Sequence, residues 1–260
     1  MKIKRIIFIP VSVVIIFVII VYSYITYQFR YSDYLVGSCI TNPQQIKNDD
    51  FVVGVIGDSW IAGSKLDDGL RTALNIPNVK IRVKSSGHPG ARTKLILEDF
   101  YSFSSFLNTS YPNSKKIYVI EGGINDAFAY LGRDFYIHHI DQLVKGGLEC
   151  GDKVLIISIP FFDRSRVETF PKKIRWSFYK AITGDIGNDN ADYYNQLLMS
   201  KYGFNKVKNV KVFDVRKLIT QNQIPEKYYD GVHMVPKYYD ELGYDLGLFI
   251  SKEYFGNGPT

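Results

Sequence analysis

The sequence places polar side chains suited to acyl transfer at two separated points of the chain. Gly57-Asp58-Ser59 follows a short apolar run, and Asp230-Gly231-Val232-His233 stands near the C-terminus. A serine hydroxyl needs an imidazole to take its proton, and that imidazole needs a partner to fix its tautomer. Asp230 can reach the second ring nitrogen of His233 if the segment forms one tight turn, which Gly231 eases. The pattern predicts a catalytic triad of Ser59, His233 and Asp230.

The elements that must position these residues alternate between short runs rich in Val and Ile and longer amphipathic stretches. The short runs favour strands and the longer stretches favour helices. The expected strands are 51–56, 80–83, 117–120, 154–159 and 210–215, and the expected helices are 60–74, 91–107, 134–149, 189–203 and 237–254. The alternation predicts an α/β fold in which a parallel sheet is covered by helices on both faces. In such a sheet the ligand site lies beyond the carboxyl ends of the strands.

Two further motifs follow the second and third expected strands, namely Ser86-Gly87 and Gly123-Ile124-Asn125-Asp126. In order, GDS, the lone glycine, GxND and DxxH resemble the signature blocks of the SGNH hydrolase (GDSL-like lipase and esterase) family over residues 51–250. The resemblance implies a flavodoxin-like α/β/α fold with a five-stranded sheet, and a serine esterase without metal or cofactor. It also implies an oxyanion hole made by the backbone N–H groups of Ser59 and Gly87 and the side-chain amide of Asn125. Because Gly87 has no side chain, its backbone N–H would be open to the substrate.

Each motif also has a purely structural interpretation. Gly57-Asp58-Ser59 alone suits a turn with Ser59 as a helix N-cap, Asn125-Asp126 suits another turn and cap, and Asp230-Gly231 is a common turn dipeptide. A lone His233 is usually structural or exposed. Their joint occurrence in the family's order favours the catalytic interpretation. Trp60 stands where the GDSL name has leucine, which bears on the subfamily rather than on the chemistry.

Other enzyme signatures do not fit. No G-x-S-x-G occurs, and Gly63-Ser64-Lys65 lacks the upstream glycine of a phosphate-binding loop. His138 and His139 are adjacent and would point to different faces of a helix, which argues against a metal site there. His88 follows Gly87 and is expected to be an exposed loop histidine rather than a substrate contact.

The stretch between Arg5 and Arg30 contains no charged residue and is long enough to cross a bilayer as a helix. Basic residues before it predict a cytoplasmic N-terminus and an extracytoplasmic remainder, periplasmic or at the cell surface. Tyr22–Tyr27 is too bulky for a signal-peptidase site, so we expect an uncleaved anchor. The expected organisation is an anchor at 1–30, a linker at 31–50 and a hydrolase domain at 51–260.

The distribution of charge limits the classes of partner that we expect, and the two cysteines bear on the redox environment. The net charge is +6, but residues 1–30 hold four basic residues and no acid, which leaves 28 basic against 26 acidic residues, or +2, for the rest. A near-neutral domain gives little reason to expect nucleic acid as a partner. Cys39 and Cys150 would face an oxidising compartment, where a disulfide and two unpaired thiols are both open alternatives. The oligomeric state is open as well.

The predicted location narrows the range of substrates that the protein could meet. An enzyme outside the cytoplasmic membrane of a bacterium meets O-acetylated polysaccharides, so the first hypothesis is a carbohydrate O-acetylesterase. The alternatives are an O-acetyltransferase that uses a sugar hydroxyl in place of water, a lysophospholipase or lipid esterase, and a non-catalytic glycan-binding protein. Residues 161–190 form a basic and aromatic insertion. Its segment 172–179 suits a bilayer interface, but we favour a lid or a packed surface helix.

Overall fold

A computed structural model describes the chain except for residues 1–10, 34–38, 40–49, 167–168, 184–189 and 257–260. It divides into two compact units, Met1–Tyr31 and Ser32–Thr260, which we describe separately. In the first unit, helix α1 (Val11–Phe29) is the one helix of the described residues that is long and apolar enough to cross a membrane. Lys2, Lys4 and Arg5, on which the predicted orientation depends, lie outside the described residues.

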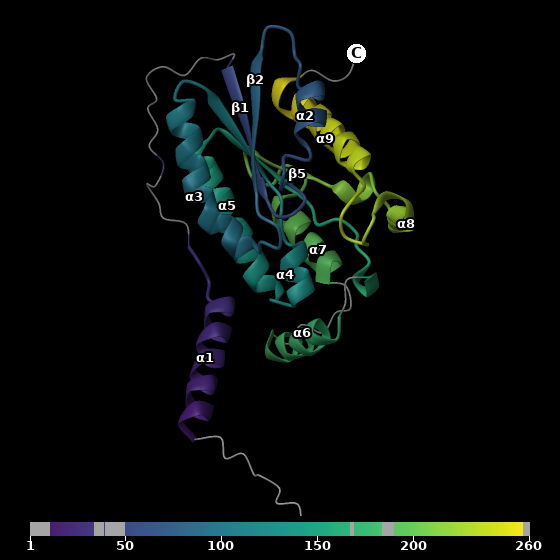
Figure 1. Cartoon of the computed structure of the whole chain (residues 1–260). Coiled ribbons are helices and arrows are strands. Elements are labelled where there is room, and N and C mark those ends of the chain that lie inside the picture. Colours follow the sequence, from purple (N-terminus) through teal and green to yellow (C-terminus); the bar gives the residue numbers. More distant parts are fainter. Residues whose placement is uncertain (1–10, 34–38, 40–49, 167–168, 184–189, 257–260) are drawn as a thin grey trace, which may run out of the picture. The chain divides into compact units, whose positions relative to one another are not determined.

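The second unit is built on a five-stranded parallel sheet (Figure 1). Its strands are β1 (Asp50–Gly57), β2 (Lys80–Gly87), β3 (Lys115–Ile120), β4 (Lys153–Ile157) and β5 (Val210–Phe213). They lie in the order β2-β1-β3-β4-β5, and every neighbouring pair is parallel. The side chains of β1 and β3 are almost all buried, because helices cover both faces of the sheet. The predicted three-layer α/β/α fold is confirmed.

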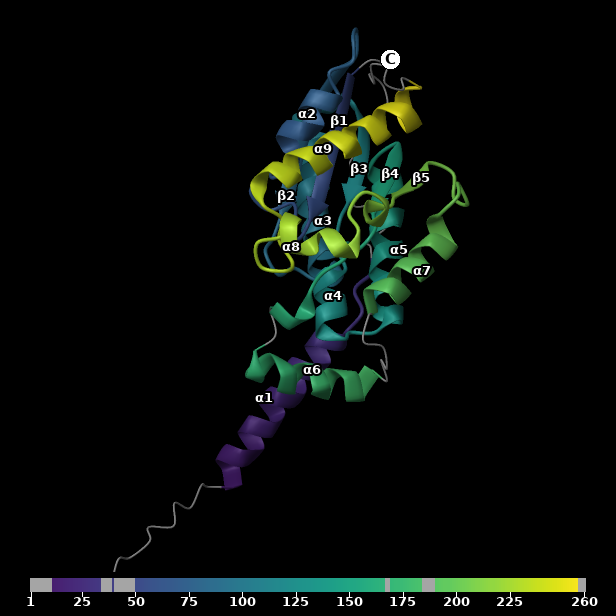
Figure 2. The same ribbon diagram turned by 90° about the vertical axis from the view of Figure 1, so that its right-hand side faces the viewer.

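Helices form the outer layers (Figures 1 and 2). On one face α2 (Asp67–Ala73) packs against α9 (Pro236–Ile250), and on the other α5 (Arg133–Cys150) packs between α3 (Thr93–Ser110) and α7 (Asn190–Tyr202). The remaining helices are α4 (Ile124–Ala129), α6 (Phe170–Thr183) and α8 (Ile224–Lys227), with short 3-10 turns at Arg164–Arg166, Val215–Lys217 and Gln221–Gln223 and a π turn at Ser251–Phe255.

The helix predicted over 60–74 is wrong in its first half. Residues 60–66 form turns, and α2 begins only at Asp67. Gly63 and Ser64 have φ values of +74° and +57°, which belong to the left-handed region and interrupt a right-handed helix. Two strands also end earlier than predicted. The strand β5 ends at Phe213 because the side chain of Asp214 accepts the N–H of Arg216 and starts a 3-10 turn.

The first residues of the second unit are hydrogen-bonded to its helices. The N–H of Ser32 donates to Nε2 of His139 over 3.0 Å. The hydroxyl of Tyr101, on α3, donates to the carbonyl of Asp33 over 2.6 Å. Another described residue of the predicted linker, Cys39, forms a disulfide with Cys150 at the end of α5. Residues 34–38 and 40–49 of the linker lie outside the described residues.

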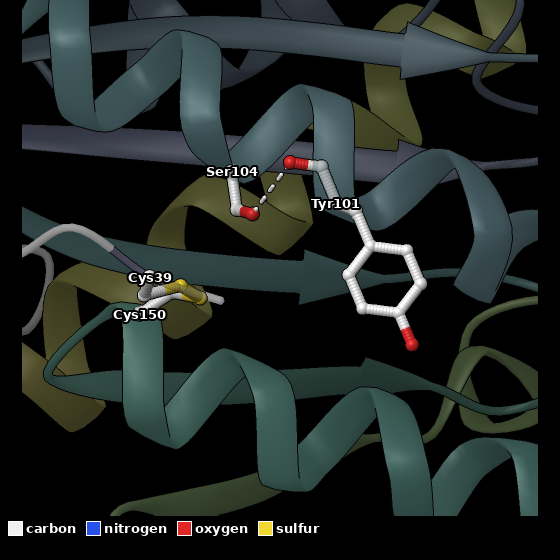
Figure 3. Close-up of a disulfide and its surroundings, with 4 residues drawn as sticks. All are labelled: Cys39, Tyr101, Ser104 and Cys150. Carbon is white, nitrogen blue, oxygen red and sulfur yellow. Dashed lines mark hydrogen bonds between the residues drawn. A yellow bond between two sulfur atoms is a disulfide. The ribbon is translucent and has the colours of Figure 1, made fainter. Parts of the chain in front are cut away.

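The disulfide resolves the alternative that the sequence leaves open. The Cα atoms of Cys39 and Cys150 are 5.2 Å apart, inside the usual range for a disulfide. Figure 3 shows the bond beside α3, where the Ser104 hydroxyl donates to the Tyr101 carbonyl over 3.1 Å. The bond closes a sequence separation of 111 residues.

Candidate active site

The structure brings Ser59, His233 and Asp230 together. Nε2 of His233 lies 2.8 Å from Oγ of Ser59, and Nδ1 lies 2.6 Å from Oδ2 of Asp230. When the Nδ1 hydrogen is donated to the carboxylate, Nε2 is the ring nitrogen that accepts the serine proton. Ser59 stands two residues beyond β1, and His233 stands three residues before α9. The arrangement can therefore activate a hydroxyl at the carboxyl edge of the sheet.

A tight turn holds the acid of this triad. Oδ1 of Asp230 accepts the N–H groups of Val232 (2.9 Å) and His233 (2.7 Å). Gly231 between them has φ +83°, a conformation that favours glycine. Burial raises the pKa of Asp230, but the hydrogen bonds from His233 and Val232 outweigh it and bring the pKa below its usual value. Asp230 is therefore ionised at neutral pH and can orient the imidazole.

A pair of buried carboxyl groups lies beneath the nucleophile. Oδ1 of Asp58 accepts the N–H of Trp60 over 3.0 Å, and Oδ2 accepts Nδ2 of Asn125 over 2.8 Å. Glu121, directly after β3, accepts the N–H of Asp58 over 3.0 Å. Burial raises the pKa of both acids. Glu121 rises further because the charge of Asp58 disfavours its ionisation, while hydrogen bonds from Trp60 and Glu121 partly offset the rise at Asp58.

The raised pKa of Glu121 therefore favours its protonated form beside the charge of Asp58. Sequence reasoning missed Glu121. The available signal was an acidic residue directly after the apolar run 117–120, two positions before the GxND motif.

The structure gives Gly87 and Asn125 contacts that the sequence does not indicate. A Cβ added at Gly87 would lie 2.3 Å from the backbone nitrogen of Ala62. Glycine is thus required by close packing against the turn after Ser59, in addition to any need for an open amide. Nδ2 of Asn125 donates to Asp58 and, over 2.9 Å, to the carbonyl of Ala91. Both amide hydrogens are used inside the protein, so Asn125 reaches a substrate oxygen only by giving up one of these bonds.

Two aromatic residues that the sequence analysis did not assign to the site contact its loops. The indole N–H of buried Trp60 donates to the carbonyl of Val232 over 3.2 Å and so joins the serine turn to the histidine loop. Tyr229 is 64% exposed, and its ring stacks on the imidazole of His233 with centroids 5.8 Å apart. Tyr229 therefore gives the site an exposed aromatic wall.

The remaining polar candidates have structural partners. His88 pairs with Asp99 over 3.0 Å. Asp126 is buried and accepts both the N–H and the hydroxyl of Thr93 at the start of α3, and burial raises its pKa to about 6. In the part of the chain that the structure describes, no three His, Cys, Asp or Glu side chains are arranged to hold a metal ion.

Solved structures with the same fold place this arrangement among known proteins. A member of the lipolytic G-D-S-L family from Veillonella parvula matches 80% of this chain and 99% of its own length, with a TM-score of 0.51 and 16% identity. A candidate lipolytic protein of the G-D-S-L family from Desulfitobacterium hafniense matches 75% and 97%, with a TM-score of 0.51 and 15% identity. A candidate GDSL-like lipase from Parabacteroides merdae matches 78% and 97%, with a TM-score of 0.50 and 13% identity.

The second unit therefore has the fold of the SGNH (GDSL-like) hydrolases, as the motifs predict. No protein-family model and no curated protein matches the sequence.

Proposed function

We propose that the protein is a serine esterase that works through an acyl-Ser59 intermediate. The observation that carries the proposal is the unbroken chain of short contacts from Ser59 through His233 to Asp230. Oγ of Ser59 attacks the ester carbonyl carbon while Nε2 of His233 takes its proton. The imidazolium then gives this proton to the leaving alkoxide. Water, deprotonated by the same nitrogen, attacks the acyl carbon, and as the bond to Ser59 breaks the imidazolium returns the proton to Oγ and the acid is released.

The tetrahedral intermediate needs hydrogen-bond donors for its oxyanion. We assign this role to the backbone N–H groups of Ser59 and Gly87 and to the amide of Asn125. Asn125 is suited to it because Asp58, the neighbour of Ser59, holds the amide in place. In this proposal the amide exchanges the carbonyl of Ala91 for the developing oxyanion, so one of its two hydrogen bonds passes to the new charge. Removing such a donor typically costs about 100- to 1,000-fold in turnover.

For the substrate we propose an O-acetylated polysaccharide outside the cytoplasmic membrane. Three observations support this choice. The helix α1 is apolar enough to anchor the chain, the Cys39–Cys150 disulfide suits an oxidising compartment, and the exposed ring of Tyr229 offers a flat surface beside His233. Aromatic rings of this kind pair one apolar face with a wet edge, which fits a sugar ring carrying hydroxyl groups.

The decisive experiment compares wild type, Ser59→Ala and Ser102→Ala for labelling by a fluorophosphonate and for hydrolysis of an acetyl ester. Ser102 is an exposed serine on α3 and serves as the matched control. We expect labelling and hydrolysis in wild type and in Ser102→Ala, and neither in Ser59→Ala. Labelling of wild type that yields product only when an acceptor sugar is added would identify an acetyltransferase. Absence of both activities from the folded wild type would refute the catalytic assignment.

A further inference from the structure

Helix α6, inside the basic and aromatic insertion, has two apolar faces. Trp176 and Tyr179 are buried against the rest of the unit. Phe170, Ile174 and Phe178 are 76%, 58% and 51% exposed. Their spacing of four residues aligns them along one side of a helix, opposite to the buried pair. The helix is therefore a packed surface helix on one side, as predicted, and carries an exposed apolar stripe on the other.

The packed side fixes the orientation of this stripe. Trp176 stacks on Phe128 of α4 with centroids 5.8 Å apart. The guanidinium of Arg164, just upstream of α6, lies 5.4 Å from the Trp176 ring and donates to the carbonyl of Ala127 over 3.1 Å. Because α6 is held to α4 by these contacts, the stripe remains on the outside. Three large apolar side chains in a row on a fixed helix indicate an interaction surface.

The charges on α6 indicate the chemistry of the partner. Lys172, Lys173 and Arg175 are exposed and stand between the apolar residues in the sequence, and Phe170–Thr183 contains no acidic residue. An apolar stripe flanked by basic side chains matches the interface of a bilayer, where acyl chains lie below anionic phosphates. A sugar would not require the exposed phenylalanines, and a purely apolar partner would not require the lysines.

The connection between α1 and the second unit is short. Ser32 is bonded to His139 in the first half of α5, and two residues separate Ser32 from the end of α1 at Phe29. Three residue steps of extended chain span about 10 Å. This short tether is the whole connection between a membrane-inserted α1 and Ser32. Figures 1 and 2 show α6 beyond α4, at the end of the unit where α5 begins.

We propose that α6 is an interfacial helix that docks the catalytic unit onto the outer surface of an anionic bilayer. Phe170, Ile174 and Phe178 enter the headgroup region, and the basic side chains contact lipid phosphates. The segment before α6 touches the triad turn, since the N–H of Asp163 donates to the carbonyl of Gly231 over 2.8 Å. Docking through α6 thus holds the active site next to the membrane. The inference depends on the proposed anchoring by α1.

The test uses the full chain in vesicles of phosphatidylcholine with phosphatidylglycerol. Both cysteines are in the disulfide, so a single introduced cysteine can be labelled specifically with an environment-sensitive fluorophore. Ile174→Cys reports on the stripe. Ser110→Cys is the matched control. Ser110 is exposed and is the last residue of α3. We expect the label at 174 to emit at shorter wavelength and to be quenched by a lipid-soluble quencher, whereas the label at 110 is quenched only by a water-soluble one.

Three results would overturn the proposal. The first is equal quenching of both labels from water. The second is shielding of the label at 174 from both quenchers, which would indicate a second protein copy on the stripe. The third is an unchanged signal in vesicles of phosphatidylcholine alone, which would remove the anionic lipid from the proposal. Alkaline extraction of the same vesicles tests the anchoring by α1, and hydrolysis of a soluble acetyl ester tests the esterase, so these failures are distinguishable.

Discussion

Replacing Glu121 by glutamine tests whether this buried carboxyl group next to Asp58 is protonated in the folded protein. A glutamine has the same shape, its oxygen can accept the N–H of Asp58, and its amide can replace the carboxyl proton against Asp58. We therefore expect Glu121→Gln to hold Asn125 in place and to retain ester hydrolysis within about tenfold, or about 1.4 kcal/mol of activation free energy. Glu121→Ala leaves the N–H of Asp58 without a partner and should lower the free energy of unfolding by about 1–3 kcal/mol or more.

The direction in which the free energy of unfolding changes with pH follows from the raised pKa of Glu121. Glu121 is protonated in both states below its ordinary pKa of 4.5. Above that value the unfolded chain releases the proton, whereas the folded protein retains it because burial and the charge of Asp58 raise the pKa. The wild type then loses about 1.4 kcal/mol of stability per pH unit until the folded group also titrates. Glutamine carries no proton that can be released. The stability of Glu121→Gln relative to wild type should therefore rise by the same amount per pH unit.

Urea unfolding of residues 31–260 between pH 5 and pH 7 measures this difference. Glu241→Gln, which removes an exposed glutamate from α9, controls for the loss of one carboxyl group. A stability difference between Glu121→Gln and wild type that does not change with pH would show that Glu121 is ionised in the folded protein. Loss of activity in Glu121→Gln would show that a negative charge is needed at this position.

Gly87→Ala should be destabilised by about 1–3 kcal/mol or more in urea unfolding, because its Cβ would lie 2.3 Å from the nitrogen of Ala62; wild-type stability would contradict that packing. Asp230→Asn should fold normally by circular dichroism but lose about 10⁴-fold in kcat, since the imidazole loses the partner that fixes its tautomer; retention of a tenth of the activity would exclude this role. The double variant Cys39→Ser, Cys150→Ser should lose up to about 4.7 kcal/mol of stability for a loop of about this length. Reduced wild type should have the same free energy of unfolding in urea as this variant. Equal stability of oxidised and reduced wild type would refute the stabilising role of the disulfide.

Local patterns were sufficient to predict the fold and to select three residues, Ser59, Asp230 and His233, that the folded chain brings together. Short runs of Val and Ile mark the five strands, and Ser59 and His233 belong to motifs that are recognisable within a few residues. The helix 60–74 was overextended because its apolar spacing is helical, while the left-handed conformations of Gly63 and Ser64 depend on packing of the folded chain.

The supporting contacts of the site could not be predicted, because they join residues far apart in the sequence. Trp60 and Val232 are 172 positions apart, and Asp58 and Glu121 are 63 apart. The pairing of Cys39 with Cys150 likewise depends on where α5 ends. For α6, the sequence shows the basic and aromatic content, but which aromatic residues face inward is decided by α4 and Arg164.

The disulfide gives this chain two covalent routes between α1 and the catalytic serine. One route is the peptide chain through residues 40–58, and the other crosses from Cys39 to Cys150. A protease that cuts between 40 and 49 therefore nicks the protein without releasing its catalytic unit while the bond stays oxidised. Shedding as a free enzyme requires a cut before Cys39, or a cut beyond it followed by reduction. A single nick and the redox state of the surroundings would together decide whether the second unit stays covalently joined to α1.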